Sequence, residues 1–317
     1  MTIIEALDFD SAEAFLINVR RSHERWVDRR DPAEAAWVFR GHGDASWSLL
    51  PRAFRPHKPG GLLSKLRERI ASEYGSRDWR KLLNPTAATL NCSDVELAET
   101  AIDALTHAGA VRLFAVLADE VRHGVTFDPL LWHVFSESRR EFHTYFSGRL
   151  KGKPAEAFAI AQHHGIPTQF LDWTLDPLVA AYFAVEGAIA TGSSHLAVWA
   201  IRRELFDREW SLCRFTVRAG VTPFLDAQAG LFTWSRRAYM LRAERGFYVP
   251  FEDFALEADA SPDFTSMPRP FLRKLILPNS ESDELLKLLW RERVTPAHLM
   301  PTFDHVTRAL EQKARWY

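Results

Sequence analysis

The chain has 317 residues, of which 47% are hydrophobic and 26% charged, a composition that excludes a disordered or fibrous protein. Its 40 Lys and Arg residues balance 41 Asp and Glu residues, which excludes a strong overall attraction to nucleic acid or to an anionic membrane. The two cysteines, Cys92 and Cys213, lie too far apart in sequence to suggest a disulfide scaffold or a cysteine-based zinc site.

The first residues lack the basic and then apolar run of a secretory signal, and the apolar stretch over 177–185 is too short to span a bilayer. P-loop, GxGxxG, HExxH and GxSxG motifs are absent. We therefore expect a cytoplasmic protein that has no membrane partner and binds no metal.

The first predicted element is a helix that begins after Asp10, because Glu13 follows at the spacing of a capping box. A strand is predicted over 37–39, followed by Arg40 and a turn with two glycines, and 46–51 is expected to be extended. The glycines would let the backbone beside Arg40 approach a ligand closely.

Residues 60–148 show helical periodicity without a strand pattern. Within this block, Asp128 and Pro129 form the cap and first residue of a predicted helix. We interpret the block as a helical insertion or subdomain within a single domain over 1–317.

The second half of the chain mixes helices with strands. Predicted helices run from Pro154 to Gly165 and from the Asp176 cap to about Gly192, and two more lie near the C-terminus, the second capped by Asp304. Strands are predicted over 169–171, 195–201, 214–217, 231–234, 247–251 and 272–277. The expected fold class is α+β, with a helical insertion and C-terminal helices.

Three short segments place polar side chains at strand ends or turns, where sites are usually built. The first contains Arg40, Gly41 and His42. A guanidinium can donate two parallel hydrogen bonds to a phosphate or carboxylate. Arg40 therefore predicts an anion-binding position, or alternatively an arginine that ties the turn to a carboxylate such as Asp172.

The second and third segments offer histidine, carboxylate, hydroxyl and amide groups. His163 and His164 end a helix, and neighbouring positions on a helix point about 100° apart, which suits a metal poorly. Asp172 and Thr174 could present oxygen atoms to a substrate hydroxyl, or could cap the turn. Gln228 could bind a ribose or a base, or satisfy the backbone of a turn.

Together the segments resemble the FRG domain, a bacterial and phage-associated family named after a Phe-Arg-Gly tripeptide. The resemblance rests on Phe39-Arg40-Gly41, on AQHHGIPTQFLDWTLDPLVAAYFA over 161–184 and on AQAGLFT over 227–233, and it extends from about 37 to 310. It implies a role as a toxin or anti-phage defence effector.

The order of these elements also resembles the ADP-ribosyltransferase superfamily, which implies a mixed or antiparallel β core and NAD as substrate. By this resemblance the catalytic residues are Arg40, which would hold the pyrophosphate or a ribose, Asp172, Thr174 and Gln228. Because Gln228 carries no charge, Asp172 or Glu244 would supply a carboxylate. The other residues expected to bind NAD are Gly41, His42, His163, His164, Tyr182 and Phe183.

A different interpretation is a nucleotide- or nucleic-acid-binding module without catalysis. Residues 139–153 are locally basic, and Phe142, Tyr145 and Phe146 are interleaved with the charges. These aromatic side chains could stack on bases, or they could form the buried face of a helix. A metal-dependent nuclease is disfavoured because no carboxylate cluster has the required spacing. The target of either activity could be a protein or a nucleic acid.

Overall fold

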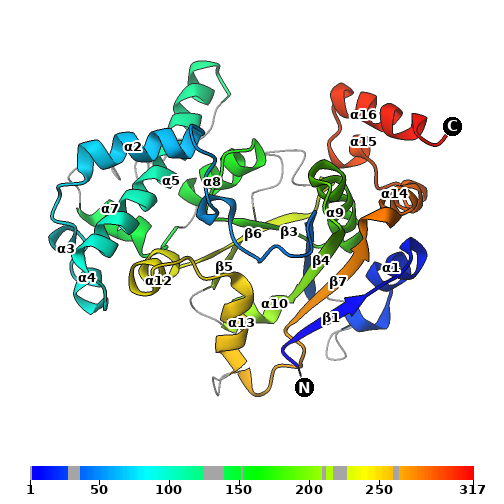
Figure 1. The fold of residues 1–317 in the computed structure, drawn as a ribbon, viewed down its shortest axis with the longest axis horizontal. Coiled ribbons are helices and arrows are strands. Elements are labelled where there is room, and N and C mark those ends of the chain that lie inside the picture. Colours follow the sequence, from blue (N-terminus) through cyan, green and yellow to red (C-terminus); the bar gives the residue numbers. More distant parts are fainter. Residues whose placement is uncertain are drawn as a thin grey trace.

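The computed structural model describes residues 2–27, 36–123, 139–150, 153–208, 212–216, 227–259 and 264–317. A seven-stranded sheet lies at its centre, in the order β1-β7-β4-β2-β3-β6-β5 (Figure 1). Its strands are β1 (Ile4–Asp8), β2 (Trp37–His42), β3 (Leu171–Thr174), β4 (His195–Arg202), β5 (Leu212–Phe215), β6 (Gly230–Ser235) and β7 (Leu272–Pro278). Only the β1–β7 pair is parallel among these described strands. The predicted α+β class with a mixed sheet is confirmed.

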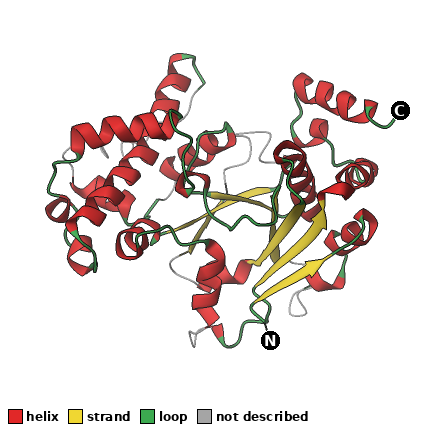
Figure 2. Cartoon of the chain, in the orientation of Figure 1, coloured by secondary structure: helices red, strands yellow, loops and turns green. Residues whose placement is uncertain are grey.

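Helices cover both faces of the sheet (Figure 2). One face packs on α1 (Ala12–Val19), α9 (Pro177–Thr191) and α14 (Ser282–Arg291). The other face packs on α10 (Arg203–Arg208) and α13 (Phe251–Asp259). Alternation along β2 decides the assignment, because Phe39 belongs to the first core and Val38 to the second.

A helical unit lies beside the β6–β5 end of the sheet (Figure 1). It comprises α2 (Leu62–Tyr74), α3 (Trp79–Leu82), α4 (Thr86–Thr89), α5 (Asp94–Glu120) and α7 (Arg139–Phe146), and it packs with α8 (Lys153–His163) and α12 (Ala238–Arg245). Phe232 and Trp234 of β6 join the same core. The helical character predicted for 60–148 is confirmed where the structure describes it, whereas Asp128 and Pro129 lie outside the described residues.

The long helix α5 is the centre of the helical unit. By length and composition it could cross a membrane, but 61% of its most apolar stretch is buried inside the protein, as in the core helix of a soluble protein. Polar residues interrupt the apolar ones along α5, so its sequence contains no long uninterrupted apolar run. Two of them, Thr106 and His107, are nevertheless buried.

Several predicted boundaries are confirmed and others are wrong. Asp176 caps α9 by accepting a hydrogen bond from the Leu178 amide at 2.9 Å, as predicted. The first helix is capped by Ser11 rather than Asp10, and the last helix, α16 (Phe303–Ala314), by Thr302 rather than Asp304. In both cases the hydroxyl residue accepts from an amide three positions ahead, which a side chain elsewhere in the turn does not do.

Two segments that were predicted to be extended form no strand. The strand expected over 247–251 is wrong, because α13 begins at Phe251 and packs its aromatic side chains under the sheet. The extended segment expected over 46–51 forms no strand and leads into the short helix η2 (Arg52–Phe54). The remaining short helices are η1 (Glu24–Trp26), η4 (Asn279–Glu281) and α15 (Pro296–Leu299).

Strand β2 and helix α9 make direct backbone contact through glycines. A Cβ atom added to Gly41 would lie 2.6 Å from the Ala184 nitrogen, and one added to Gly43 would lie 2.6 Å from the Cα of Gly187. These distances are too short for a real Cβ atom. The two glycines are therefore needed for helix packing, and the expectation that they let a ligand approach the backbone beside Arg40 stays a prediction.

We expect Gly43→Ala to lower the melting temperature by about 5 °C or more. The new methyl group would clash with backbone atoms of α9, and a rotamer change cannot relieve such a clash. Gly60→Ala is the control, since Gly60 has φ +72° but a Cβ there would meet nothing within 4 Å. Its loss should be about 2 °C. Thermal melts of both variants measure the difference, and an equal or smaller loss for Gly43→Ala would contradict the packing argument.

A buried polar network joins three helices of the core. The Tyr239 hydroxyl lies 3.0 Å from His107 Nδ1 and 2.9 Å from the Tyr145 hydroxyl, and all three residues are buried. Burial lowers the pKa of His107 to about 4. The imidazole is therefore neutral in the folded protein at neutral pH.

This burial predicts acid sensitivity. Above pH 6.5 His107 is neutral in both states, whereas between pH 6.5 and about 4 only the unfolded chain binds the proton. The free energy of unfolding should therefore fall as the pH is lowered, by up to about 3 kcal/mol from this group. Urea melts of the parent and of His107→Asn, which retains a hydrogen-bonding group near Tyr239, should show a shallower pH dependence for the variant. Identical slopes would assign the acid sensitivity to other groups.

Candidate functional site

A pocket of about 50 Å³ opens between β2, β3 and the first turns of α9. Strands β2 and β3 are paired only at Phe39 and Thr174, so they separate beyond this pair and leave room between them. The side chains and backbone that line the pocket come from Phe39, Arg40, Gly41, Asp172, Trp173, Thr174, Val179, Ala180, Phe183, Gln228, Gly230, Leu231 and Phe232.

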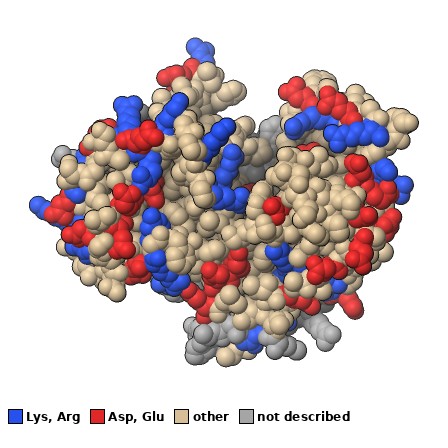
Figure 3. Space-filling view, in the orientation of Figure 1, with Lys and Arg blue, Asp and Glu red and all other residues tan. Residues whose placement is uncertain are grey.

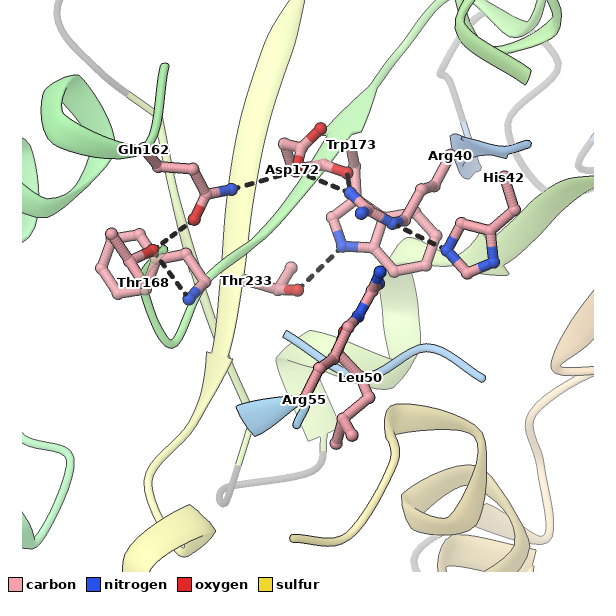
Figure 4. Close-up of polar contacts among 10 residues, drawn as sticks. Arg40, His42, Leu50, Arg55, Gln162, Thr168, Asp172, Trp173 and Thr233 are labelled. Carbon is pink, nitrogen blue, oxygen red and sulfur yellow. Dashed lines mark hydrogen bonds and ion pairs between the residues drawn. The ribbon is translucent and has the colours of Figure 1, made fainter. Parts of the chain in front are cut away.

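The Arg40 guanidinium fills part of the gap between the two strands (Figure 4). Its Nη1 donates to the Asp172 carbonyl at 2.7 Å and to Asp172 Oδ1 at 2.6 Å, and its Nε donates to His42 Nε2 at 3.1 Å. The side chain thus bridges the strands where their own ladder has stopped. The alternative that Arg40 is tied to the Asp172 carboxylate is what the structure shows.

The Asp172 carboxylate lies at the open side of this pair, with 63% of its side chain exposed against 15% for Arg40. Gln162 of α8 donates its amide to the same oxygen at 3.0 Å, and the Thr168 hydroxyl in turn donates to the Gln162 carbonyl. Loss of water acts to raise the pKa of Asp172, but the Arg40 guanidinium outweighs it and the pKa is lowered. Asp172 is therefore ionised at neutral pH.

His42 lies behind Arg40 and is buried. Burial, followed by the charges of Arg40 and Arg55, holds the pKa of His42 well below its usual range. A neutral imidazole can accept the hydrogen bond from Arg40 Nε, which a protonated one cannot. His42 therefore orients Arg40 and does not line the pocket.

Thr174 and Gln228 meet on the other side of the pocket. The Thr174 hydroxyl donates to the Gln228 carbonyl at 2.6 Å and accepts from the Asp176 amide at 2.9 Å. The Gln228 side chain donates to the Leu299 carbonyl at 3.3 Å. Thr174 thus connects the end of β3, the start of α9 and the segment before β6.

The structure brings together six of the residues that the sequence analysis assigned to the site: Arg40, Gly41, Asp172, Thr174, Phe183 and Gln228. Their chemical roles stay predictions. Tyr182 lies in the apolar core under α9, and His164 is exposed and stacks on Phe114 of α5, with ring centroids 5.9 Å apart. Neither these two nor His163 and Glu244 line the pocket.

Two residues near the pocket escaped the sequence analysis. Gln162 lies inside the AQHHG run, but no spacing rule shows that its amide reaches Asp172. Arg55 lies just after η2, and its guanidinium is directed toward Arg40 (Figure 4). Arg55 belongs to no recognisable motif, and Gln162 belongs to the run that carries the FRG resemblance without being marked there as a site residue, so only the fold shows that both lie at the site.

The structure also bears on the interpretation as a nucleic-acid-binding module. Phe142, Tyr145 and Phe146 are buried in the core of the helical unit, so they cannot stack on bases and instead form the apolar face of a helix. On the face drawn in Figure 3, basic and acidic side chains are interspersed over the helical unit. Among the described residues, no group of three or more His, Cys, Asp or Glu could hold a metal ion.

A model of the FRG domain family matches residues 115–192. The chain contains an FRG domain. The match is shorter than the resemblance expected over 37–310, and it covers the continuous piece with Gln162, Asp172, Thr174 and α9, but neither Arg40 nor Gln228. No curated protein and no solved structure matches the chain. The FRG domain thus supplies β3, α9 and the carboxylate side of the pocket.

Thr174→Val should destabilise the protein, because it leaves the Asp176 amide and the Gln228 carbonyl without their shared partner. We expect a loss of about 1–3 kcal/mol in the free energy of unfolding. Thr174→Ser keeps the hydroxyl and should lose less than half of that. Denaturant melts of the two variants provide the comparison, and equal losses would show that the methyl group matters instead.

Proposed function

We propose that the protein is an NAD-using enzyme of the ADP-ribosyltransferase type. The observation that carries the proposal is the shared pocket, in which Arg40, Thr174 and Gln228 meet although they come from three separate segments. Phe183 of α9 adds an aromatic wall to the same pocket. A cation, a hydroxyl group, an amide and an aromatic ring are the groups that bind phosphate, ribose and a flat heterocycle.

The reaction would break the bond between the nicotinamide nitrogen and C1′ of its ribose. Nicotinamide leaves with the bonding electron pair, and the ribose passes through a state with oxocarbenium character, which a nucleophile of the target then attacks at C1′. The nucleophile loses its proton as the new bond forms. Asp172, kept ionised, is the pocket carboxylate that can stabilise the positive ribose, and the proton passes to water because the lowered pKa makes this carboxylate a weak base.

The size of the pocket limits what can enter it. A volume of about 50 Å³ holds a few water molecules, whereas a cavity that takes an aromatic ring measures about 150 Å³, so the pocket walls must move apart before a ring can enter. One ring would lie between Phe183 and the β2–β3 gap, and the remainder of NAD would extend over the open side near Asp172.

The proposed role as a toxin or defence effector depends on the FRG resemblance alone.

A second candidate function is a nucleotide-binding module without catalysis. It is favoured by the pairing of Asp172 with Arg40 and by the neutral side chain of Gln228. With the carboxylate held by a cation, the pocket as it stands can bind a ligand more readily than it can stabilise a positive ribose.

NAD at about 100 times its dissociation constant should raise the melting temperature by about 4 °C, and Arg40→Gln should abolish the shift. Arg69→Gln, which removes an exposed arginine of α2, is the matched control and should keep it. Nicotinamide release with candidate protein or nucleic-acid targets then separates the two functions. Binding without release identifies a module, and no shift with NAD overturns the enzyme proposal.

A further inference from the structure

Arg55 is held in place beside the pocket by two contacts. Its Nε donates to the Leu50 carbonyl at 3.0 Å, and its guanidinium lies over the Trp47 ring at 5.3 Å from the ring centroid. The side chain is half-buried. Its two terminal nitrogens point toward the Arg40 guanidinium (Figure 4), and no described residue accepts a hydrogen bond from them. A fixed guanidinium with two unused donors is prepared for an oxygen-rich anion.

The charges around Arg55 are unbalanced. Burial lowers the pKa of Arg55, the charges of Arg40 and Arg52 lower it further, and only Asp172 acts in the opposite direction. His42, which also lies near, is neutral. Two neighbouring guanidinium groups therefore share one carboxylate, and the remaining positive charge lies in a place that water reaches only in part.

We propose that Arg40 and Arg55 together bind the diphosphate group of a nucleotide, and that Asp172 holds the position on Arg40 which a phosphate oxygen takes when the ligand binds. Two forked donors suit two adjacent phosphoryl groups, because each fork can bind a pair of oxygens. A diphosphate also brings more negative charge than the single carboxylate it replaces. Release from Arg40 leaves the Asp172 carboxylate, still held by Gln162, free to act on a ribose.

The inference rests on the proposed function only for the identity of the ligand as a nucleotide. Inorganic pyrophosphate and ADP are therefore suitable probes, since neither contains nicotinamide. Isothermal titration with each should show binding to the parent that weakens as salt is added. Arg55→Gln should weaken binding of both probes at least about tenfold. Arg69→Gln should bind as the parent does.

Asp172→Asn gives the sharpest test, because it removes the competing charge and keeps the shape of the side chain. It should bind pyrophosphate about threefold or more tightly than the parent. Weaker binding would show that Asp172 positions Arg40 for the anion and would overturn the exchange. Arg55→Lys keeps the charge without the fork and should fall between the parent and Arg55→Gln, so the test survives if Arg55→Gln fails to fold.

The two proposals fail in different ways. If pyrophosphate and ADP bind in an Arg55-dependent way but NAD releases no nicotinamide, the diphosphate site is supported and the proposed enzyme activity is contradicted. If Arg55→Gln releases nicotinamide from NAD at an unchanged rate and affinity, the enzyme activity is supported and the diphosphate site is contradicted. Binding of pyrophosphate without ADP would assign the site to a free phosphate compound instead of a nucleotide.

Discussion

The close contact between β2 and α9 is the constraint on which the rest of the site depends. Helices usually stand off from a sheet by a layer of side chains, but Gly41, Gly43 and Gly187 let these two backbones touch. Because α9 starts directly after β3, the packing of α9 against β2 also determines where β3 ends. The gap between β2 and β3 follows from this arrangement, and the first turns of α9 become its wall.

The polar groups in that gap are bound to one another. Arg40 spans the gap to Asp172, Gln162 reaches the same carboxylate from α8, and Thr174 bonds to the chain at Gln228. A ligand that enters must therefore break these hydrogen bonds before it can form its own. The net binding free energy gained from each replaced bond is small, because one hydrogen bond is lost for each one formed. Such a pocket selects ligands whose charge and geometry outmatch the internal ones.

Local signals in the sequence were reliable where the chain itself decides the structure. Asp176 and Pro177 mark the start of α9 as predicted, and the strand predicted at Trp37 is found there, although β2 continues to His42 through residues that were expected to form a turn. Six of the candidate residues line one pocket, although their roles stay predictions. What the sequence could not show depends on distant partners. β1 is five residues long and pairs with β7, and the aromatic run that ends at Phe251 favours a strand until the sheet above it requires a helix.

Arg55 and Gln162 escaped notice for the same reason. Each is an ordinary polar residue in its own segment, and it acquires meaning only when the helical unit and α8 fold against the sheet. The glycines beside Arg40 were recognised in the sequence, but their close packing against α9 was not.

The buried group of His107, Tyr145 and Tyr239 carries a consequence for how this protein can vary. Each side chain in this group is a hydrogen-bond partner of another. Replacing one by an apolar residue therefore leaves a buried hydroxyl or imidazole without a partner, which lowers the free energy of unfolding by more than the lost hydrogen bond alone. Replacing all three together by apolar side chains of similar shape removes that cost. Related sequences should therefore keep all three polar residues or replace all three. Substitutions at these positions should be correlated, although the positions lie on helices far apart in the chain.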